Sequence, residues 1–393
     1  MQMPKEHKPK LLILSPRFPF PLDKGDKLRL FHQIKRLSEA FKISLVALSD
    51  ESVIDSSEEA LEKYVHSMHI LYQGSLRNPK AIIKSFFLNQ AIQVSYYYQS
   101  SLQKKIDQII EIESPDLMYV QLIRMAFYTK NSKVPCFIDY MDAMSLNMER
   151  ESNYHKGLIR WIYKREHKLL SKAEIEKSEN FEGKSIISDQ DKAYLQKLGV
   201  SNLHVVQNGV DLDYFNQNNL KGVQRKYDIV FVGNMGYLPN VEAAEYLVNT
   251  VAKRNWSVLI AGSRPHKRVK RLENENIVVS GWVPDIRTAY LSGAIMVAPI
   301  FSGAGQQNKV LEAMALSKVC ISTTQVAKGI GAEHNKTIIV ADTPNEFQNQ
   351  IETLLENPNL ADSIGKNARI FVEENFHWDL QVEKLKKALL SVI

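Results

Sequence analysis

The sequence predicts an α/β protein made of two doubly wound parallel sheets, and three observations support this fold class. Short apolar runs alternate with helix-like segments along the whole chain, an order of elements that is typical of parallel sheets. The chain has 393 residues, which exceeds the usual size of one hydrophobic core. A polar stretch at residues 216–226 lies between two halves that share this alternation, and we interpret it as a linker.

In the first half, a strand expected at residues 11–14 leads through a proline-containing loop into a helix. Apolar residues from Leu28 to Leu37 recur at helical spacing, and Asp26 is the expected N-cap. A strand at residues 42–48 then completes a strand–helix–strand unit. Further strands are expected at residues 116–120, 136–139 and 184–187.

A long helical region is expected at residues 143–177. Its stretch 158–170 mixes aromatic, aliphatic and basic residues, as helices at a membrane surface do. A helix that packs against its own domain and turns a basic face outward is the alternative interpretation.

The second half predicts a second parallel sheet. Its strands are expected at residues 228–232, 257–261, 276–280, 294–298, 319–322 and 337–341, and residues 345–393 are helical in pattern. We therefore expect an N-terminal domain at 1–204, a C-terminal domain at 205–372, and a C-terminal helix at 373–393 that packs back on the first domain. Ligands bind at the carboxyl ends of strands in such sheets, so a site is expected in a cleft between the domains.

Composition and charge narrow the choice of ligand. The chain is 44% hydrophobic and 24% charged, as in an ordinary globular protein. Its net charge of +6 gathers in residues 5–10, 24–42 and 160–172. Basic faces of this kind suit diphosphate substrates or an anionic membrane surface, although solvated lysines are the alternative. No nucleic-acid-binding motif accompanies these bases, so no nucleic acid partner is expected.

The cysteines and the apolar runs indicate a cytoplasmic protein. Cys136 and Cys320 lie inside apolar runs and are interpreted as buried core residues. Two cysteines provide no disulfide framework, which fits a reducing compartment. The run from Leu11 to Leu14 is too short for a signal peptide, and no run reaches the roughly 18 apolar residues of a membrane span. We expect a soluble protein or one bound at the inner face of the cell membrane.

Two loops that follow predicted strands carry weak signals for anion binding. In residues 21–27, Gly25 lets the backbone approach a ligand at a helix start, and Lys27 adds positive charge. An ordinary helix-capping turn is the commoner cause of this pattern. In the next loop, Gly233 and Gly236 resemble a degenerate phosphate loop, without the Walker lysine or a complete G-x-G-x-x-G.

The loop from Ser302 to Asn308 is the most informative segment. Its glycines expose backbone N–H groups at a helix N-terminus, which is an anion site. Lys309 follows in the first helical turn, where a cation opposes the helix dipole, and this suggests an anionic ligand. Glu312 shares a helix face with Lys309, so it could accept hydrogen bonds from ribose hydroxyls while Lys309 holds a diphosphate. A surface ion pair between Glu312 and a nearby base is the alternative.

These residues also resemble a family signature. Residues 303–315, Gly-Ala-Gly-Gln-Gln-Asn-Lys-Val-Leu-Glu-Ala-Met-Ala, with the strand at 319–323, resemble the nucleotide-sugar signature of retaining GT-B glycosyltransferases of family 4. Residues 208–215 are similar to that family's Asn-Gly-Val-Asp segment at the domain junction. Residues 23–29, 233–240 and 281–285 resemble the branch associated with bacterial exopolysaccharide and exosortase systems. The resemblance spans nearly the whole chain and implies the GT-B fold, with two Rossmann-like domains facing across a cleft.

The resemblance implies roles for individual residues. Glu312 would hold the ribose, and Lys309 with Gly305 to Asn308 would hold the diphosphate of a nucleotide sugar. Both side chains are expected to take part in catalysis. The other residues expected at the nucleotide sugar are Gly25, Asp26, Lys27, Gly233, Asn234, Arg264, Val283, Gly303, Gln306 and Gln307.

The chain departs from that family in two places. The family signature has an earlier glutamate that contacts the transferred sugar, and Ala304 occupies its position here, so the sugar contact must come from elsewhere. Many members carry a histidine after a central strand of the first domain, but residues 138–145 contain none. Asp142 is the candidate for a catalytic polar group at the reacting sugar, and Asp139 is interpreted as a structural residue at a strand end.

The sequence therefore predicts a retaining glycosyltransferase that moves a sugar from a nucleoside diphosphate sugar to a saccharide or lipid-linked saccharide, in bacterial surface or exopolysaccharide synthesis. No cofactor besides this co-substrate and no metal is expected. Asp211-Leu-Asp213 is not interpreted as a metal site because it lies in the domain-junction segment. The alternatives are a nucleotide-sugar 2-epimerase or hydrolase on the same fold, and a non-catalytic relative that acts as a scaffold.

Overall fold

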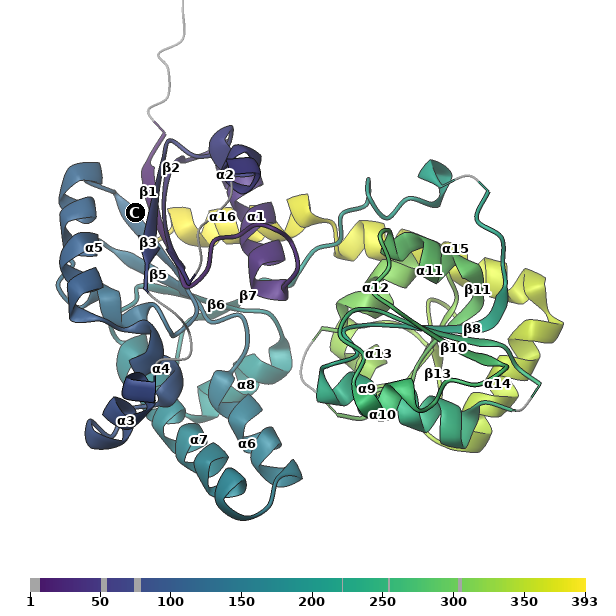
Figure 1. Ribbon diagram of the computed structural model, residues 1–393. Coiled ribbons are helices and arrows are strands. Elements are labelled where there is room, and N and C mark those ends of the chain that lie inside the picture. Colours follow the sequence, from purple (N-terminus) through teal and green to yellow (C-terminus); the bar gives the residue numbers. More distant parts are fainter. Residues whose placement is uncertain (1–7, 51–54, 74–78, 221, 254, 303–305) are drawn as a thin grey trace, which may run out of the picture. The chain divides into compact units, whose positions relative to one another are not determined.

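The computed structural model describes residues 8–50, 55–73, 79–220, 222–253, 255–302 and 306–393 (Figure 1). The chain divides into two compact units, one of residues 1–207 with 381–393 and the other of residues 208–380. The domain ends expected after residues 204 and 372 lie a few residues before these divisions. Across the described residues, no helix combines the length and the apolar character that crossing a membrane requires.

A seven-stranded parallel sheet forms the centre of the N-terminal unit, with the order β3-β2-β1-β4-β5-β6-β7 (Figure 1). The order reverses between β1 and β4, and loops at such a switch point leave a crevice at the carboxyl ends of the strands. The strands are β1 (Lys10–Ser15), β2 (Lys42–Ser49), β3 (Ser67–Tyr72), β4 (Leu117–Gln121), β5 (Cys136–Asp139), β6 (Gly183–Ile186) and β7 (Leu203–Val205). The predicted doubly wound sheet is confirmed, and the edge strands β3 and β7 are additional to the predicted ones.

Helices connect these strands. They are α1 (Gly25–Leu37), α2 (Asp55–Glu62), α3 (Pro79–Phe87), α4 (Ile92–Tyr97), α5 (Ser100–Glu113), η1 (Ala126–Thr129), α6 (Met144–Tyr154), α7 (Gly157–Ser178) and α8 (Asp189–Lys197). The helical region expected at 143–177 is thus a pair of helices, because the chain leaves the helical path at His155 and Lys156. The last helix, α16 (Trp378–Leu390), contributes its residues from Gln381 onward to this unit.

Helix α1 begins differently from the prediction. Gly25 is its first residue and Lys24 occupies the N-cap, without a side-chain hydrogen bond at the cap. Asp26, the predicted N-cap, lies in the first turn and forms an ion pair with Arg17. The prediction is wrong because the guanidinium of Arg17 takes the carboxylate that would otherwise accept from backbone amides. The position still suits a negative charge, since the helix dipole is positive at that end.

A buried ion pair joins α1 to the sheet. Arg29 and Asp139 are both 0% exposed, and Arg29 Nε donates to Asp139 Oδ2 at 2.7 Å. The hydroxyls of Tyr119 and Ser185 donate to the same carboxylate at 2.8 and 2.9 Å. Burial favours the neutral acid, but the charge and hydrogen bonds of Arg29 outweigh it and hold the pKa of Asp139 below its ordinary value. The interpretation of Asp139 as a structural residue at a strand end is confirmed.

The C-terminal unit contains a six-stranded parallel sheet, with the order β10-β9-β8-β11-β12-β13. Its strands are β8 (Tyr227–Val232), β9 (Val258–Ala261), β10 (Ile277–Gly281), β11 (Gly293–Ala298), β12 (Cys320–Ser322) and β13 (Ile339–Val340). The order reverses between β8 and β11. All the strands predicted for the second half are present, and the second doubly wound sheet is confirmed.

Helical segments also alternate with these strands. They are η2 (Gln217–Asn219), α9 (Leu238–Tyr246), the π-helical turn η3 (Leu247–Val251), α10 (Lys267–Lys270), α11 (Ile286–Ser292), α12 (Asn308–Ala315), α13 (Thr324–Ile330), α14 (Pro344–Glu356) and α15 (Pro358–Asn375). With α16, helices α14 and α15 confirm the helical pattern expected near the C-terminus.

The polar stretch 216–226 is not a linker between the units. Phe215, which precedes it, is buried in the core of the C-terminal unit. At its other end, the backbone N–H of Lys226 donates to the carbonyl of Ser292 at 2.8 Å. Both ends are therefore anchored in one unit, and the chain passes between the units after Gln207 and after Leu380 instead. High polarity marked a surface loop here, and the expected linker is wrong.

Replacement of Asp139 by alanine is expected to destabilise the N-terminal unit by about 3–5 kcal/mol, because it leaves the charge of Arg29 buried without its partner. The measurement is urea unfolding of the full chain, followed by circular dichroism. The control is Glu111→Ala on the exposed face of α5, which should change the free energy of unfolding by less than about 0.5 kcal/mol. A loss for Asp139→Ala as small as that of the control would contradict the assignment.

Candidate functional site

A pocket of about 340 Å³ lies in the C-terminal unit at the carboxyl ends of β8 and β9. Strand β8 borders the switch point of the sheet, where ligands bind in folds of this kind. The lining residues are Val232, Gly233, Asn234, Gly262, Ser263, Trp282, Val283, Ile286, Tyr290, Lys309 and Glu312. Five predicted site residues thus meet in one hollow, namely Gly233, Asn234, Val283, Lys309 and Glu312.

The floor of the pocket is a close crossing of two backbones. Gly262 has a φ of +141°, and a Cβ added there would lie 1.7 Å from the carbonyl oxygen of Gly233. A Cβ on Gly233 would in turn lie 3.3 Å from Lys309 Cε and 2.9 Å from Asn240 Nδ2. Only glycine fits at residue 262, and glycine at residue 233 lets the stem of Lys309 lie against the loop after β8.

Lys309 lies in the first turn of α12, as predicted, and its side chain is half-buried. Its Nζ donates to Oε1 of Gln307, the N-cap residue, at 2.9 Å. Burial lowers the pKa of Lys309 to about 8, although the nearby charge of Glu312 acts in the opposite direction. Among the described residues, no carboxylate forms an ion pair with Lys309. A desolvated ammonium that lacks such a partner and faces a pocket is suited to an anionic ligand.

Glu312 lies one turn further along α12 and is held by α11. The hydroxyl of Tyr290 donates to Glu312 Oε2 at 2.7 Å. Burial raises the pKa of Glu312, while this hydrogen bond and the charge of Lys309 favour the carboxylate. Burial also raises the pKa of Tyr290, so the phenol remains a donor. The carboxylate is therefore oriented, and its second oxygen is available to accept from hydroxyl groups of a ligand.

The loop before α12 is described only in part. The predicted residues Gly303 and Gly305, and the departure at Ala304, lie outside the described residues. Gln306 Oε1 accepts from the backbone N–H of Asn208 at 2.8 Å, and Gln306 Nε2 donates to the Asn208 carbonyl at 2.7 Å. The side chain of Gln306 thus ties this loop to the segment that opens the unit.

Two more predicted residues of this unit have distinct surroundings. Within the described part of the chain, the buried Oδ1 of Asn308 has no hydrogen-bond partner. Arg264 is exposed, has a φ of +54°, and follows the lining residue Ser263 without lining the pocket itself. The backbone of Arg264 packs against the loop of Asn234 instead, since a Cβ on Gly236 would lie 3.1 Å from the Arg264 carbonyl oxygen.

Three predicted residues of the N-terminal unit, Gly25, Asp26 and Lys27, lie at the start of α1. A Cβ on Gly25 would meet no atom within 4 Å, so the backbone there is open. Asp26 pairs with Arg17. Lys27 Nζ lies 2.9 Å from Asp23 Oδ1. Both charged side chains of this turn therefore have partners of opposite charge.

Asp142 follows β5 in the N-terminal unit. Its Oδ2 accepts from Asn147 Nδ2 at 2.7 Å. Burial raises the pKa of Asp142, and the charge of Asp191 adds to that effect. Arg124, after β4, contributes an opposing charge, and within the described part of the chain its buried Nε has no hydrogen-bond partner. The carboxyl ends of β4 and β5 thus bring together a carboxyl group and a guanidinium that are both desolvated.

Sequence reasoning missed several lining residues of the pocket. These are Val232, Gly262, Ser263, Trp282, Ile286 and Tyr290. Ile286 and Tyr290 have the four-residue spacing of one helix face, which was a usable signal. Gly262 follows a predicted strand directly, as Gly233 does. The hydrogen bond from Tyr290 to Glu312 depends on how α11 and α12 pack, and no local pattern reports it.

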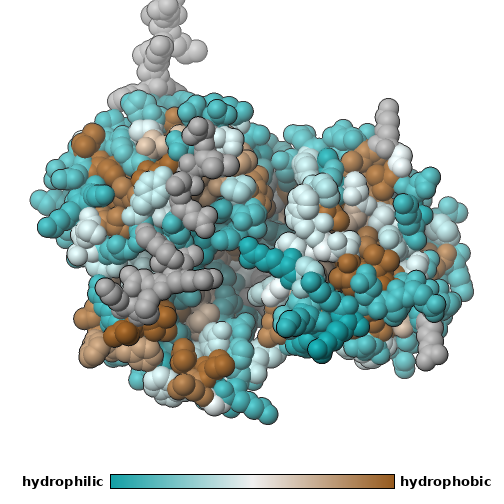
Figure 2. All heavy atoms as spheres, viewed as in Figure 1, coloured by the Kyte–Doolittle hydropathy of each residue, from teal (hydrophilic) through white to brown (hydrophobic). Residues whose placement is uncertain are grey.

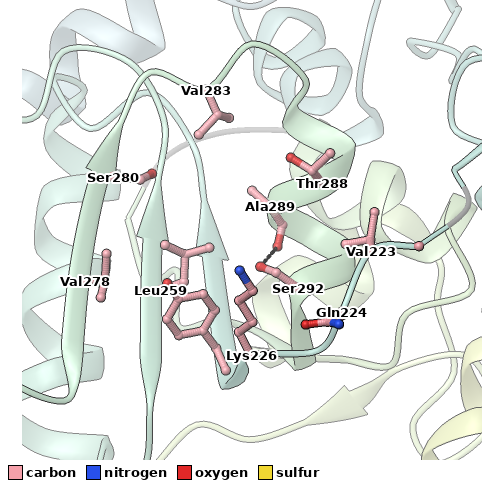
Figure 3. Close-up of a pocket in the computed structure, with 12 residues that line it drawn as sticks. Val223, Gln224, Lys226, Leu259, Val278, Ser280, Val283, Thr288, Ala289 and Ser292 are labelled. Atoms are coloured by element: carbon pink, nitrogen blue, oxygen red, sulfur yellow. Dashed lines mark hydrogen bonds between the residues drawn. The ribbon is translucent and has the colours of Figure 1, made fainter.

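A second hollow of about 420 Å³ lies beside the first, and Val283 lines both. Figure 3 shows the residues that line it, which come from residues 222–226, from β8, β9 and β10, from the loop at Val283, and from α11. Lys226 is the charged residue among its described lining residues, which include no carboxylate. The second hollow thus offers no pairing of cation and carboxylate like that of Lys309 and Glu312, and we place the chemistry in the first pocket.

Residues 226–357 match the family described as Glycosyl transferases group 1. This span contains every lining residue of the first pocket. The C-terminal unit carries a glycosyltransferase group 1 domain. The prediction of a transferase enzyme is confirmed at this level, and the pocket with Lys309 and Glu312 belongs to the glycosyltransferase domain.

Full-length comparisons extend the similarity to the rest of the chain. The chain is 22% identical over 386 residues to an uncharacterized 44.6 kDa protein of the cps region of Klebsiella pneumoniae. This alignment covers 93% of this chain and 96% of that protein. The structure resembles sucrose-phosphate synthase from Thermosynechococcus elongatus, with a TM-score of 0.72, 15% identity, and coverage of 97% and 98% of the two chains. It also resembles Anabaena HepE in complex with UDP and glucose, with a TM-score of 0.69, 13% identity, and coverage of 97% and 100%. The predicted GT-B fold class is confirmed.

Gly262→Ala is expected to destabilise the glycosyltransferase domain by at least about 2 kcal/mol, because it adds backbone strain and a collision with the Gly233 carbonyl. The measurement is the thermal unfolding midpoint by calorimetry. Gly25→Ala, which meets no neighbouring atom, serves as the control and should leave the midpoint almost unchanged. Equal midpoints for the two variants would contradict the close crossing.

Proposed function

We propose that the protein transfers a sugar, with retention of anomeric configuration, from a nucleoside diphosphate sugar to a saccharide or lipid-linked saccharide in bacterial surface polysaccharide synthesis. The proposal assigns the chain to the family 4 type of retaining enzymes. One observation carries it. The pocket of the glycosyltransferase domain presents the ammonium of Lys309 and the oriented carboxylate of Glu312 on one face of α12.

These two groups divide the recognition of the donor. The ammonium of Lys309 would bind the diphosphate, and the amide groups at the N-terminus of α12 would support it, because helix N-termini favour anions. Glu312 would accept hydrogen bonds from the two ribose hydroxyls. Val283 and Ile286, which line the same pocket, would provide apolar contacts for the base.

The same groups would act in the transfer step. The bond between the anomeric carbon and the diphosphate oxygen breaks, and negative charge develops on the leaving diphosphate. Lys309 would stabilise this charge from a fixed, partly desolvated position, where electrostatic stabilisation is strongest. The acceptor hydroxyl forms the new bond to the anomeric carbon, and its proton passes to the oxygen of the leaving diphosphate. This chemistry requires no metal, and we propose that the enzyme uses none.

Asp142 is the proposed catalytic group of the acceptor-binding N-terminal unit. Burial and the charge of Asp191 raise its pKa and so favour the acid form, which suits a carboxyl group that takes part in proton transfer. Arg124 lies close enough to Asp142 to influence its charge. A polar group of this kind would take the place of the histidine that residues 138–145 lack.

The setting of the reaction is proposed from the relatives. The Klebsiella relative comes from a cps region, which supports a role in polysaccharide synthesis. The HepE structure contains UDP and glucose, so UDP-sugars are the first donors to test. A lipid-linked acceptor would place the enzyme at the inner face of the cell membrane.

The decisive experiment incubates the protein with labelled nucleotide sugars and lipid-linked saccharide acceptors, with EDTA in one arm and magnesium in another. We expect a glycosylated product with retained anomeric configuration, formed equally in both arms. Asp142→Asn should lower the rate of transfer but leave donor binding intact. Loss of turnover in EDTA that magnesium restores would overturn the metal-free mechanism.

Two other outcomes correspond to other functions. Free sugar or an epimer released from the donor alone would indicate a hydrolase or a 2-epimerase. Donor binding without turnover across all acceptors would indicate a non-catalytic scaffold, which Ala304 makes conceivable because the usual sugar contact is missing there.

Lys309→Met and Glu312→Gln are expected to weaken UDP binding in different ways. Lys309→Met should lower the affinity for UDP by about 100-fold and the affinity for uridine by less than threefold, because only the diphosphate loses its charge partner. Glu312→Gln should instead reduce the preference for UDP over its 2′,3′-dideoxy analogue by about tenfold. Calorimetric titration measures both. Lys318→Met, which replaces a buried lysine outside the pocket, is the control, and equal losses for UDP and uridine would contradict the role of Lys309.

The affinity for UDP is expected to fall by about tenfold between pH 7 and pH 9, because Lys309, with its pKa of about 8, is charged below that pH and neutral above it. Titrations across this range should show the fall in the wild type and a flat profile in Lys309→Met. The pKa of Lys318 is also lowered to about 8 by burial. A profile that flattens in Lys318→Met would therefore place the titrating group outside the pocket.

A further inference from the structure

A second surface of the N-terminal unit is unusually apolar. Figure 2 shows brown atoms gathered at the lower left of this unit, where Figure 1 places α3 and α7. Phe87 of α3 is 86% exposed, and Leu158 of α7 is 72% exposed. We call this surface the α3–α7 patch and define it by Ile83, Phe86, Phe87, Leu158, Ile159 and Trp161, all of which are exposed.

The two helices form one continuous surface. The rings of Phe86 and Trp161 stack with centroids 6.2 Å apart and planes 10° apart. The guanidinium of Arg165 also lies over the ring of Phe86, with its carbon 4.2 Å from the ring centroid. Arg165 also donates to the carbonyl of Ser85 at 2.8 Å. The exposed apolar side chains therefore lie on two helices that are held together by these contacts.

The border of the patch is basic. Lys156, Arg160, Lys164 and Lys168 recur at four-residue intervals and are exposed, so they form a stripe along one side of α7. Lys84 is exposed on α3. In the described residues 82–90 and 156–168, the acidic residue is Glu166, which is buried and accepts from the backbone N–H of Ile92. The charge presented to solvent by these two segments is positive.

We propose that the α3–α7 patch docks on a lipid bilayer with anionic headgroups. Transfer of exposed aliphatic side chains into the boundary between headgroups and acyl chains lowers the free energy. Trp161 has the amphipathic ring that is favoured at the headgroup level, and the basic stripe is complementary to anionic lipids. A bilayer covers apolar side chains without requiring matching hydrogen-bond partners.

The patch explains the mixed composition of residues 158–170 more fully than the sequence does. The apolar contribution of α3 makes the surface broader than a single helix face. Docking would hold the enzyme where a lipid-linked acceptor lies, and this consequence rests on the proposed function. The docking itself depends only on the patch and its charge.

The experiment is co-sedimentation of the full chain with vesicles of phosphatidylcholine alone or with 30% phosphatidylglycerol, at about 0.1 M salt, where charges are screened over roughly 10 Å. We expect strong binding to anionic vesicles only. Phe87→Ser combined with Leu158→Ser should lower the partition coefficient at least tenfold, and Arg160→Gln combined with Lys164→Gln should do so as well. The matched controls on α5 are Ile112→Ser, at a residue that is 76% exposed, and Lys104→Gln combined with Lys105→Gln.

Several results would overturn the proposal. These are equal losses in the α5 controls, unchanged binding in both patch variants, and equal binding to neutral vesicles. Quenching of tryptophan fluorescence by brominated lipids should be lost in Trp161→Phe, and persistent quenching would place another segment at the bilayer. Circular dichroism of every variant excludes unfolding as the cause of a loss.

The same variants separate this proposal from the proposed function. Calorimetric titration with UDP should give wild-type affinity in the patch variants, because the nucleotide pocket lies in the other unit. Vesicle binding without any UDP binding would support membrane docking by the α3–α7 patch and contradict the proposed donor site. UDP binding without vesicle binding would retain the donor site and refute the patch.

Discussion

The candidate site depends on a lysine placed where its charge is unfavourable. Lys309 stands in the first turn of α12, where the helix dipole repels a cation, and burial lowers its pKa to about 8. The surrounding structure maintains this arrangement. Gln307 Oε1 accepts a hydrogen bond from the ammonium, the glycine at residue 233 leaves room for the lysine stem, and Glu312 adds a nearby negative charge. An anion bound in the pocket would pair with the ammonium of Lys309. It would thereby offset both the repulsion by the helix dipole and the desolvation of the charge, so these two effects favour binding.

The two sheets use their switch points differently. In the C-terminal unit, the crossing of Gly262 over Gly233 brings backbone to the pocket floor, and the side chains of Lys309 and Glu312 on α12 supply charge. In the N-terminal unit, a Cβ added at Gly25 in the first turn of α1 would meet no atom within 4 Å, but the carboxylate of Asp26 forms an ion pair with Arg17. Among the described residues, the buried Nε of Arg124, which follows β4 at this switch point, has no hydrogen-bond partner. Similar sheets thus present a pocket with a cation and a carboxylate in one unit and a desolvated cluster of side chains in the other.

Periodicity predicted most of the fold because both sheets are buried and their strands are continuous apolar runs. It failed where burial is partial, as at the edge strand β3, whose residues are mostly half-buried. The interpretation of residues 216–226 as a linker was wrong for a related reason. A polar composition indicates that a segment is exposed to solvent, but it does not indicate to which unit the ends of the segment are anchored. Within the site, Lys309 and Glu312 follow from helix spacing. Tyr290 does not, because its contact with Glu312 forms only when two helices pack.

The two aspartates near the end of β5 show how position determines chemistry. Asp139 and Asp142 are three residues apart and both are desolvated, yet their pKa values shift in opposite directions. Arg29 neutralises Asp139 inside the core, so that carboxylate is fixed and has no proton to exchange. Asp142 faces Asn147 and the charge of Asp191 instead, so its acid form is favoured. Carboxyl groups whose pKa values shift apart differ in the form that they favour, so Asp142 and not Asp139 is the one proposed to exchange a proton.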